Sequence, residues 1–307
     1  MLYNWKIIGH EKQLQNLEAD IRTNNLSHAY LFTGPGKMGK FTVAKKLAYI
    51  LQCPNNYCMK CPVCTQIEKG SHPDTIEMRD NQESIKINEV REIINRLNMT
   101  SDSRYKVVLL ENTARMSIEA MNSLLKILEE PPEKTIFILT ASNPKDLPET
   151  IVSRTRIIKF SSFSDTVLFE KMKERITEVS EEELQKMCSL ALGRPGKVFN
   201  FINDYELFNY YKNLYDNIWN FLKNDNIAQK FQFVNEISSS PDKVKDLLDI
   251  LTHLIRSILI KNDGFKIKNT YTDSKLLEIL NEIFKTKQLL KRNVNTRLTL
   301  ENLMLTL

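Results

Sequence analysis

The sequence predicts an α/β domain with a parallel sheet covered by helices, followed by two all-helical parts. Three observations support this prediction. Short apolar runs of strand character alternate with helix-length segments as far as Phe160. After Phe160 these runs disappear, and the periodic stretches have the spacing of amphipathic helices. A glycine-rich loop joins the first predicted strand to the helix after it, as in many α/β domains.

The first predicted strand runs into glycines, and a helix follows them. The strand covers His28–Gly34, and the helix covers Phe41–Gln52, where apolar residues recur at helical spacing. Later runs are apolar throughout, which is typical of strands buried on both faces of a parallel sheet. These runs are Asp74–Met78, Tyr105–Glu111, Thr135–Ser142 and Arg156–Phe160. The segments between them are long enough for crossover helices.

The change of pattern after Phe160 places the predicted domain boundaries. Residues 1–161 form the α/β domain in this prediction. Residues 162–204 form a small helical domain, because Glu181–Ile202 has the pattern of two helices around a Gly-Pro turn. Residues 205–307 form a separate helical bundle, and Val244–Ile260 is one of its amphipathic helices.

Size and charge limit the possible classes of protein. A chain of 307 residues can build two or three small domains. Its net charge of +5 permits contact with nucleic acid but falls short of a strongly cationic DNA-binding protein. The sequence shows no signal-peptide pattern and no apolar run near the roughly 20 residues of a membrane helix. We therefore expect a cytoplasmic protein.

The loop Gly34–Phe41 reads GPGKMGKF and matches G-x-x-x-x-G-K-[ST] at every fixed position except the last. Its glycines let backbone N–H groups close around phosphate oxygens, and Lys40 can reach the terminal phosphates. The three glycines of the loop are Gly34, Gly36 and Gly39. The pattern predicts a nucleotide site that retains its phosphate-binding half.

The metal-binding and catalytic half of this site is predicted to be lost. The last motif position normally supplies a hydroxyl to Mg²⁺, and the Phe41 ring has no lone pair to offer. Thr42 is rotated by roughly 100° around the helix axis, so it should face away from the metal. After the third strand, Glu111 keeps a negative charge, either as a metal contact or as part of a turn, while Asn112 is an amide that cannot act as general base. ATP binding is therefore expected to be weak and ATP hydrolysis negligible.

Four of the five cysteines lie within twelve residues of one another. Cys53, Cys58, Cys61 and Cys64 have the spacing C-x₄-C-x₂-C-x₂-C. Reduced cysteines grouped in this way indicate metal binding rather than disulfides in a cytosolic chain. Four thiolates close a tetrahedral site, so we predict a structural Zn²⁺. The fifth, Cys188, stands apart and is predicted to be a packing residue.

Several further motifs occur in the order found in sliding-clamp loader subunits of the AAA+ family. The most specific of them is NSLLKILEEPP, Asn122–Pro132. The others are SHPD (Ser71–Asp74), TASNP (Thr140–Pro144), VSRTR (Val152–Arg156) and LGRPGK (Leu192–Lys197). With its degenerate nucleotide site and intact Ser-Arg pair, the chain resembles the delta-prime type of subunit of bacterial DNA polymerase III. The resemblance implies an AAA+ domain, a helical lid and a C-terminal helical collar that joins subunits into a ring.

The resemblance also implies roles for individual residues. Asn143 would be a sensor at a strand end, although its place before Pro144 also fits an ordinary turn. Arg194 would be the arginine of the lid, or it only separates two helices. Arg154 would act as an arginine finger in the active site of a neighbouring subunit. Pairing of Arg154 with a local acid such as Glu149 is the alternative, and Arg156 is a second candidate for the finger.

The partners implied by the resemblance are the gamma/tau and delta subunits of the loader, the sliding clamp, and primed DNA bound through the whole complex. The leading hypothesis is a non-motor loader subunit. Two alternatives stay open. One is a motor ATPase of the gamma/tau type, which should have a hydroxyl at position 41 and an Asp-Glu pair at 111 and 112. The other is a zinc-dependent DNA-binding module.

Overall fold

The computed structural model describes residues 3–55, 57–100, 103–224, 226–260, 271–292 and 294–307. The chain divides into two compact units. The first contains residues 1–178 and 193–197, and the second contains residues 179–192 and 198–307. Among the described residues, no helix is both long and apolar enough to cross a membrane.

The first unit is built around a five-stranded sheet in the order β2-β3-β4-β1-β5, in which all neighbouring strands are parallel. The strands are β1 (Ala29–Thr33), β2 (Thr75–Met78), β3 (Lys106–Leu110), β4 (Thr135–Ala141) and β5 (Arg156–Lys159). Each lies within one of the predicted strand segments. Because the strands are parallel, all their carboxyl ends lie at one edge, where the residues of the candidate nucleotide site gather.

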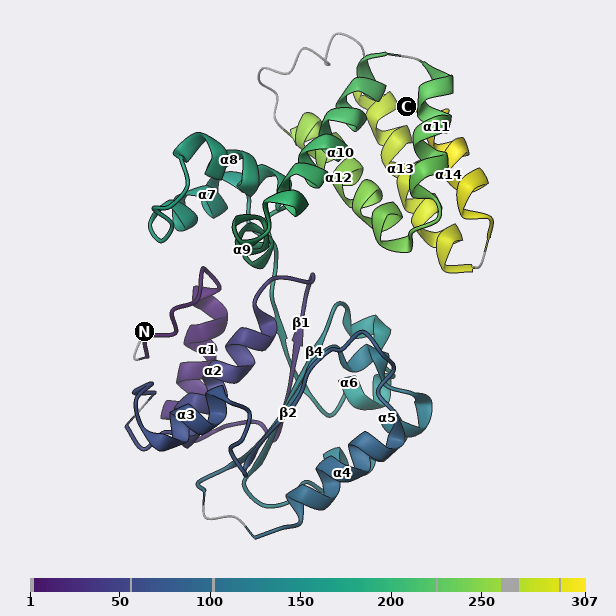
Figure 1. Ribbon diagram of the computed structural model, residues 1–307. Helices are drawn as coiled ribbons and strands as arrows, with labels where there is room; N and C mark the ends of the chain where they lie inside the picture. Colours follow the sequence, from purple (N-terminus) through teal and green to yellow (C-terminus); the bar gives the residue numbers. More distant parts are fainter. Residues whose placement is uncertain (1–2, 56, 101–102, 225, 261–270, 293) are drawn as a thin grey trace. The chain divides into compact units, whose positions relative to one another are not determined.

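Helices cover both faces of this sheet (Figure 1). The helices of the first unit are α1 (Glu11–Arg22), α2 (Lys40–Gln52), α3 (Pro62–Glu68), α4 (Ile87–Leu97), α5 (Ile118–Glu129), α6 (Glu149–Val152) and α7 (Asp165–Lys173), with the short 3₁₀ helices η1 (Thr113–Arg115) and η2 (Pro144–Asp146). Figure 1 shows α1 and α2 on one side of the sheet and α4 to α6 on the other.

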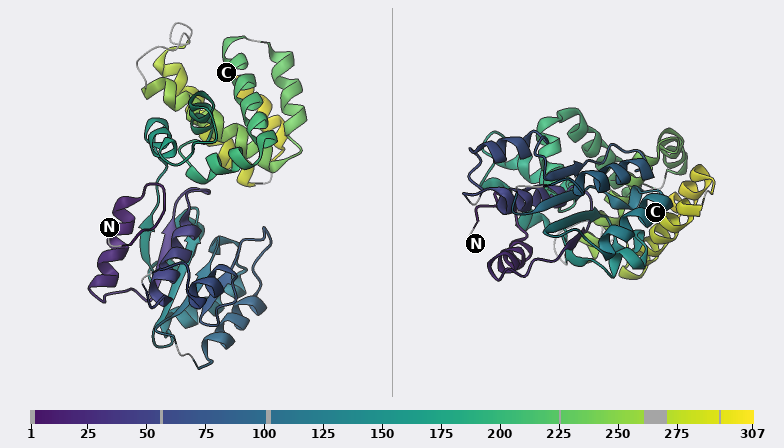
Figure 2. Two further views of the ribbon diagram at one scale, coloured as in Figure 1. Left: turned by 60° about the vertical axis from the view of Figure 1, so that its left-hand side comes forward. Right: turned by 90° about the horizontal axis from the view of Figure 1, so that it is seen from below.

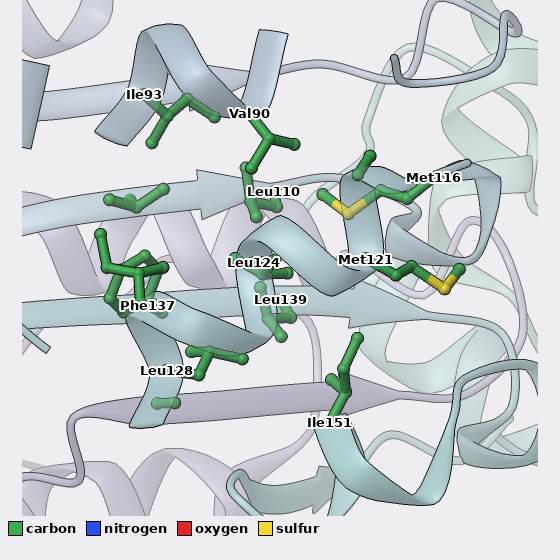
Figure 3. Packing of buried hydrophobic residues seen from close by; sticks show 14 of the residues in the cluster. Val90, Ile93, Leu110, Met116, Met121, Leu124, Leu128, Phe137, Leu139 and Ile151 are labelled. Atoms are coloured by element: carbon green, nitrogen blue, oxygen red, sulfur yellow. The ribbon is translucent and has the colours of Figure 1, made fainter. Parts of the chain in front are cut away.

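Two hydrophobic clusters form because successive side chains of a strand point to opposite faces. In β1, Leu31 joins the cluster under α4, α5 and α6, while Phe32 joins the cluster under α1 and α2. Figure 3 shows the first cluster, in which Leu124 and Leu128 of α5 pack over Phe137 of β4. Burial on both faces explains why these strands read as continuous apolar runs.

The described elements of the second unit are helical. They are α8 (Glu181–Leu190), α9 (Pro195–Asn203), whose first residues belong to the first unit, α10 (Tyr205–Lys223), α11 (Ile227–Ile237), α12 (Pro241–Ile260), α13 (Asp273–Leu289), η4 (Leu290–Arg292) and α14 (Thr296–Met304). Within the bundle, α12 packs on α13 and α11 on α14. Figure 2 shows this bundle and the layered sheet of the first unit from two further directions.

The predicted fold class is confirmed as far as its architecture: a parallel sheet covered by helices, followed by helices. The two helices expected around a Gly-Pro turn are α8 and α9. The three-domain division at residues 161 and 204 stays a prediction. The two compact units are divided at other positions, after residues 178, 192 and 197. Residues 261–270, which the sequence places after the amphipathic helix in the predicted bundle, lie outside the described residues.

Candidate nucleotide site, exposed arginine and cysteine cluster

The P-loop connects β1 to α2 and depends on two glycines. Gly34 has φ 139°, and a Cβ atom there would overlap the carbonyl oxygen of Phe160. Gly39 has φ 83° and is the N-cap of α2. Positive φ values of this kind are accessible to glycine without steric cost, which explains both residues. Gly36 meets no such constraint in the described structure, since nothing lies within 4 Å of a Cβ placed there.

Lys40 folds back over the loop. Its Nζ donates hydrogen bonds to the carbonyl oxygens of Gly34 at 2.6 Å and Pro35 at 2.7 Å. Burial lowers the pKa of Lys40 to about 8, while the charge of Glu111 raises it and the charge of Arg194 lowers it. Lys40 still carries most of its charge at pH 7, so the loop retains a cation for phosphate.

Phe41 has become a core residue instead of a metal ligand. Its ring is only 7% exposed and packs in the cluster under α1 and α2. The guanidinium carbon of Arg79 lies 4.3 Å from the ring centre, a cation–π distance. Thr42, by contrast, is exposed. The position that holds the metal-binding hydroxyl in P-loop enzymes is thus filled by a buried ring with a cation on top.

Asn112 and Glu111 are held by the segment that follows β2. Asn112 has a left-handed backbone, φ 52°, which asparagine tolerates better than most residues. Its Nδ2 donates to Asp80 Oδ2 at 2.8 Å, and its N–H donates to Thr140 Oγ1 at 2.9 Å. Glu111 Oε2 accepts the N–H of Asp80 at 3.3 Å. Asp80 also pairs with Arg115, Nε to Oδ1 3.4 Å. An amide cannot accept a proton from water near neutral pH, and these contacts hold the Asn112 side chain in place without supplying a base.

The LGRPGK motif is anchored on the P-loop, which brings Arg194 to the site. The N–H of Gly196 donates to the carbonyl of Lys37 at 2.9 Å, and a Cβ at Gly196 would crowd the same oxygen. Gly193 has φ 71° and accepts the N–H of Phe163 at 3.0 Å. The charge of Arg194 contributes to the lowered pKa of Lys40, after burial of the ammonium.

Asn143 lies at the carboxyl end of β4 and caps η2. Its Oδ1 accepts the N–H of Lys145 at 3.0 Å, which is the expected turn chemistry. Asn143 also lines a cavity of about 420 Å³ together with Gly34 and Pro35 of the P-loop. The structure therefore places Asn143 beside the loop, while its oxygen serves the turn. Its role as a sensor stays a prediction.

Arg154 lies two residues after the end of α6, with its side chain 35% exposed. Its Nη2 pairs with Glu129 Oε1 at 2.7 Å, and its Nη1 donates to the carbonyl of Thr150 at 2.9 Å. The local acid is thus Glu129, within the NSLLKILEEPP motif, rather than Glu149. Arg156 on β5 is tied to Asp20, Nη1 to Oδ1 2.7 Å, and Asp20 is nearly buried. Of the two arginines, Arg154 has the more exposed partner.

The four clustered cysteines meet at the C-terminal end of α2. Their sulfur atoms all lie within 4.8 Å of one another, with Cys53 3.7 Å from Cys58 and 3.8 Å from Cys61. Sulfur atoms 2.3 Å from a tetrahedral Zn²⁺ lie about 3.8 Å apart, so the spacing fits that ion. Backbone N–H groups of Cys58, Cys61 and Cys64 each approach a cluster sulfur at 3.4–3.5 Å.

The thiols of the cluster differ in acidity. Hydrogen bonds from the backbone at Lys60 and Cys61 lower the pKa of Cys58 to about 6, whereas burial raises that of Cys64. A bound metal ion deprotonates its thiol ligands, so it would remove this difference. Cys188 belongs to the second unit and is buried in α8, as predicted for a packing residue.

A model of the family described as "DNA polymerase III, delta subunit" matches residues 9–164, just over half of the chain. The chain belongs to this family. The matched part contains the P-loop, the four cysteines and Arg154, and it ends before the LGRPGK motif. The resemblance to subunits of DNA polymerase III is confirmed at this level.

Individual relatives agree with this family. The chain is 32% identical over 205 residues to DNA polymerase III subunit gamma of Buchnera aphidicola, 64% of this chain and 56% of that protein. It is 33% identical over 196 residues to subunit tau of Bacillus subtilis, 61% and 35%. It is 30% identical over 181 residues to subunit delta-prime of Bacillus subtilis, 57% and 55%. The matched part of the chain thus spans between 35% and 56% of the length of these relatives.

Among solved structures, a DNA polymerase III gamma subunit-related protein from Thermotoga maritima covers 94% of the chain. The chain covers 97% of that protein, with a TM-score of 0.45 and 21% identity.

Sequence reasoning missed three residues of these sites. Arg79 and Asp80 follow β2 directly, at the same sheet edge as the P-loop, and Glu129 ends α5. The position of Arg79 and Asp80 after a predicted strand was the available signal, because parallel strands bring their carboxyl ends together. No comparable signal in the sequence pairs Glu129 with Arg154.

Proposed function

We propose that this chain is a non-motor clamp loader subunit of the delta-prime type, which helps a neighbouring subunit to hydrolyse ATP but does not hydrolyse it. The observation that carries the proposal is the contrast within the first unit. The catalytic half of its nucleotide site is filled by Phe41, Arg79 and Asp80, whereas Arg154 lies partly exposed on a different element.

Hydrolysis in P-loop enzymes needs a metal ion and a group that positions water. In this chain the metal-holding hydroxyl is replaced by a buried ring. The amide of Asn112 is engaged by Asp80. Gly34, Gly36, Gly39, Lys40, Glu111, Asn143 and Arg194 then form a degenerate nucleotide site that binds ATP weakly.

Arg154 suits the role of a finger for chemical reasons. Negative charge on a transferring phosphoryl group must be met by a positioned cation, and the guanidinium can donate two parallel hydrogen bonds to phosphate oxygens. An arginine supplied by another subunit can raise turnover by roughly 10³ to 10⁵. The ion pair with Glu129 is half exposed, so a neighbouring phosphate could replace it at small cost.

The remaining parts are proposed to serve assembly. Residues 162–204 would be the lid and residues 205–307 the collar that joins this chain to gamma/tau and delta subunits. The complex would act on the sliding clamp and on primed DNA. Cys53, Cys58, Cys61 and Cys64 would hold a structural Zn²⁺ that braces the excursion between α2 and β2, because their sulfurs have the spacing of that ion.

A motor role of the gamma/tau type is the second candidate, because gamma and tau proteins are among the relatives with the higher identity. The two candidates differ in steady-state phosphate release by the purified chain. For a non-motor subunit we expect negligible phosphate release with and without primed DNA. A rate of phosphate release comparable to that of other P-loop ATPases would contradict the proposed function.

The test of the finger is a reconstituted complex containing a motor subunit, the clamp and this chain as wild type or Arg154→Ala. We expect assembly to be intact and the DNA-stimulated ATPase rate to fall by about 10²-fold or more at each motor site that receives the finger. Arg156→Ala is the neighbouring control, since Asp20 already binds that guanidinium. An unchanged rate in a complex shown to contain the Arg154→Ala chain would rule out the finger.

A further inference from the structure

A groove of about 630 Å³ lies between α12 and the C-terminal end of α13 in the second unit. The two helices pack side by side (Figure 1). The volume is within the range of roughly 300–1,000 Å³ found for ligand pockets. The α12 wall has residues at the spacing of one helix face, namely Pro241, Val244, Lys245, Leu248 and Asp249. This stripe is about 12 Å long at 1.5 Å per residue, so it can accommodate a segment of about two helical turns.

The floor of the groove is apolar. Val244 and Leu248 of α12 are 4% and 3% exposed, and Leu290 of η4 is partly buried on the opposite wall. These side chains are held by the packing of the bundle, so they form a surface that is already in place before any partner binds. Burial of a leucine or phenylalanine side chain of another protein on this surface is favourable, because it removes apolar area from water.

The charged residues that line the groove are three lysines and one aspartate, namely Lys245, Lys287, Lys291 and Asp249. Lys287 Nζ lies 3.0 Å from Asp249 Oδ1, so these two charges balance each other. Lys245 and Lys291 are exposed, and neither forms an ion pair with another residue that the structure describes. Each wall of the groove thus contributes one lysine whose charge is not balanced by a neighbour.

The charge of the groove selects its occupant. A second copy of this chain has a net charge of +5 and is not complementary to the two lysines. Residues 261–270 contain three lysines and one aspartate, so this stretch of the chain has the wrong sign as well. A helix with apolar residues on one side and carboxylates beside them matches both the floor and the lysines. Such helices commonly bind by laying their apolar face into a groove.

From these observations we infer that the groove between α12 and α13 binds an acidic amphipathic helix of a partner protein. Leucine or phenylalanine side chains of that helix contact Val244 and Leu248. Its carboxylates pair with Lys245 and Lys291. The inference goes beyond the proposed function, because it uses no residue of the nucleotide site, the cysteine cluster or the arginine finger.

The test is fluorescence anisotropy of the full chain with a labelled peptide of about 12 residues, long enough for about three helical turns. The peptide is built of leucine and glutamate, with the leucines on one face. Two matched peptides have glutamine or lysine in place of every glutamate. At an ionic strength of about 0.1 M, charges beyond roughly 10 Å are screened. We expect the glutamate peptide to bind more tightly than the glutamine peptide and at least about tenfold more tightly than the lysine peptide.

The double variant Lys245→Glu/Lys291→Glu reverses both charges and should weaken binding of the glutamate peptide about tenfold. Lys212→Glu/Lys243→Glu is the matched control, since it reverses two exposed lysines of the same unit that do not line the groove. Its effect should be smaller than about threefold. Ser239→Trp places a large ring in the groove from the turn before α12 without changing a charge, and it should also weaken binding about tenfold.

Thermal unfolding of each variant is measured beside wild type, and the three peptides test the charge preference on wild type alone. The inference is overturned if the glutamate peptide binds wild type no more tightly than the glutamine peptide. It is also overturned if either groove variant, folded as wild type, binds the glutamate peptide as well as wild type does.

Two other occupants would give their own results. Tighter binding of the lysine peptide would overturn the inference in favour of a basic segment such as residues 261–270. A wild-type dimer in light scattering that Lys245→Glu/Lys291→Glu dissociates would overturn it in favour of a second copy of this chain. None of these outcomes decides the Arg154 experiment, which measures an ATPase rate.

Discussion

The two ends of α2 carry two candidate metal sites that differ in their donor atoms. At its N-terminus, the P-loop leads into Phe41, whose buried ring replaces an oxygen ligand. At its C-terminus, Cys53 is the C-cap and begins a set of four sulfur atoms with the spacing of a tetrahedral ion. The same helix and the same sheet support both ends. The donor atoms therefore decide whether a site can hold a metal, because the P-loop backbone keeps its form without the oxygen ligand.

The largest effect is expected at the C-terminal end. Cys61→Ser should abolish binding of about one Zn²⁺ per chain and lower the stability of the first unit by at least about 4 kcal/mol, because a structural metal contributes directly to folding. For a unit of this size the melting temperature should fall by roughly 8–16 °C. Zinc content by atomic absorption and thermal unfolding are the measurements.

Cys188→Ala is the matched control, since it removes a cysteine outside the cluster and should leave the zinc content unchanged. Equal zinc content and equal melting temperature in wild type and Cys61→Ser would remove the contrast between the two ends of α2.

A smaller effect is expected at the N-terminal end, where Phe41 is a core residue. Phe41→Ala should destabilise the chain by about 3 kcal/mol, because it leaves a cavity and removes the ring under Arg79. Phe41→Leu keeps most of the volume and should cost less than about 1.5 kcal/mol. Chemical denaturation provides both values.

Phe199→Ala serves as the comparison, because this phenylalanine is 42% exposed and should change stability by less than about 0.5 kcal/mol. If Phe41→Ala were equally harmless, position 41 would be a vacant ligand position rather than part of the core.

The smallest effect concerns the protonation of Lys40. Burial lowers its folded-state pKa to about 8, below the ordinary value of 10.5. Below pH 8 the charge therefore disfavours the folded state, and the cost disappears as pH rises from about 8 to 10.5, where the unfolded chain binds more protons. Compared with Lys40→Met, wild type should gain stability across this window, by of the order of 1 kcal/mol given partial exposure.

Denaturation of both proteins between pH 7 and 10 measures this difference, and other titrating groups cancel in the comparison. A difference that is constant with pH would mean that Lys40 is solvated like a surface lysine. Burial at the P-loop would then not lower the pKa of Lys40.

The sequence predicted the sheet, the P-loop and the cysteine cluster closely because each depends on local rules. Strands buried on both faces must be apolar throughout, a loop with positive φ values needs glycine, and a tetrahedral thiolate site needs four cysteines within reach of one another. All five predicted strands were found, with boundaries shifted by at most one residue at either end.

The residues that fill the lost half of the nucleotide site could not be predicted, because they come from other parts of the chain. Arg79 and Asp80 reach Phe41 and Asn112 from another strand, and Glu129 reaches Arg154 from another helix. These contacts join residues separated by 25 to 38 positions along the chain, so they depend on strand order and helix packing rather than on any local preference. The loss of the hydroxyl and of the acid can be read directly from residues 41 and 112, because an absent functional group is a property of one residue. What replaces them is a property of distances in space, which the chain fixes only when it folds.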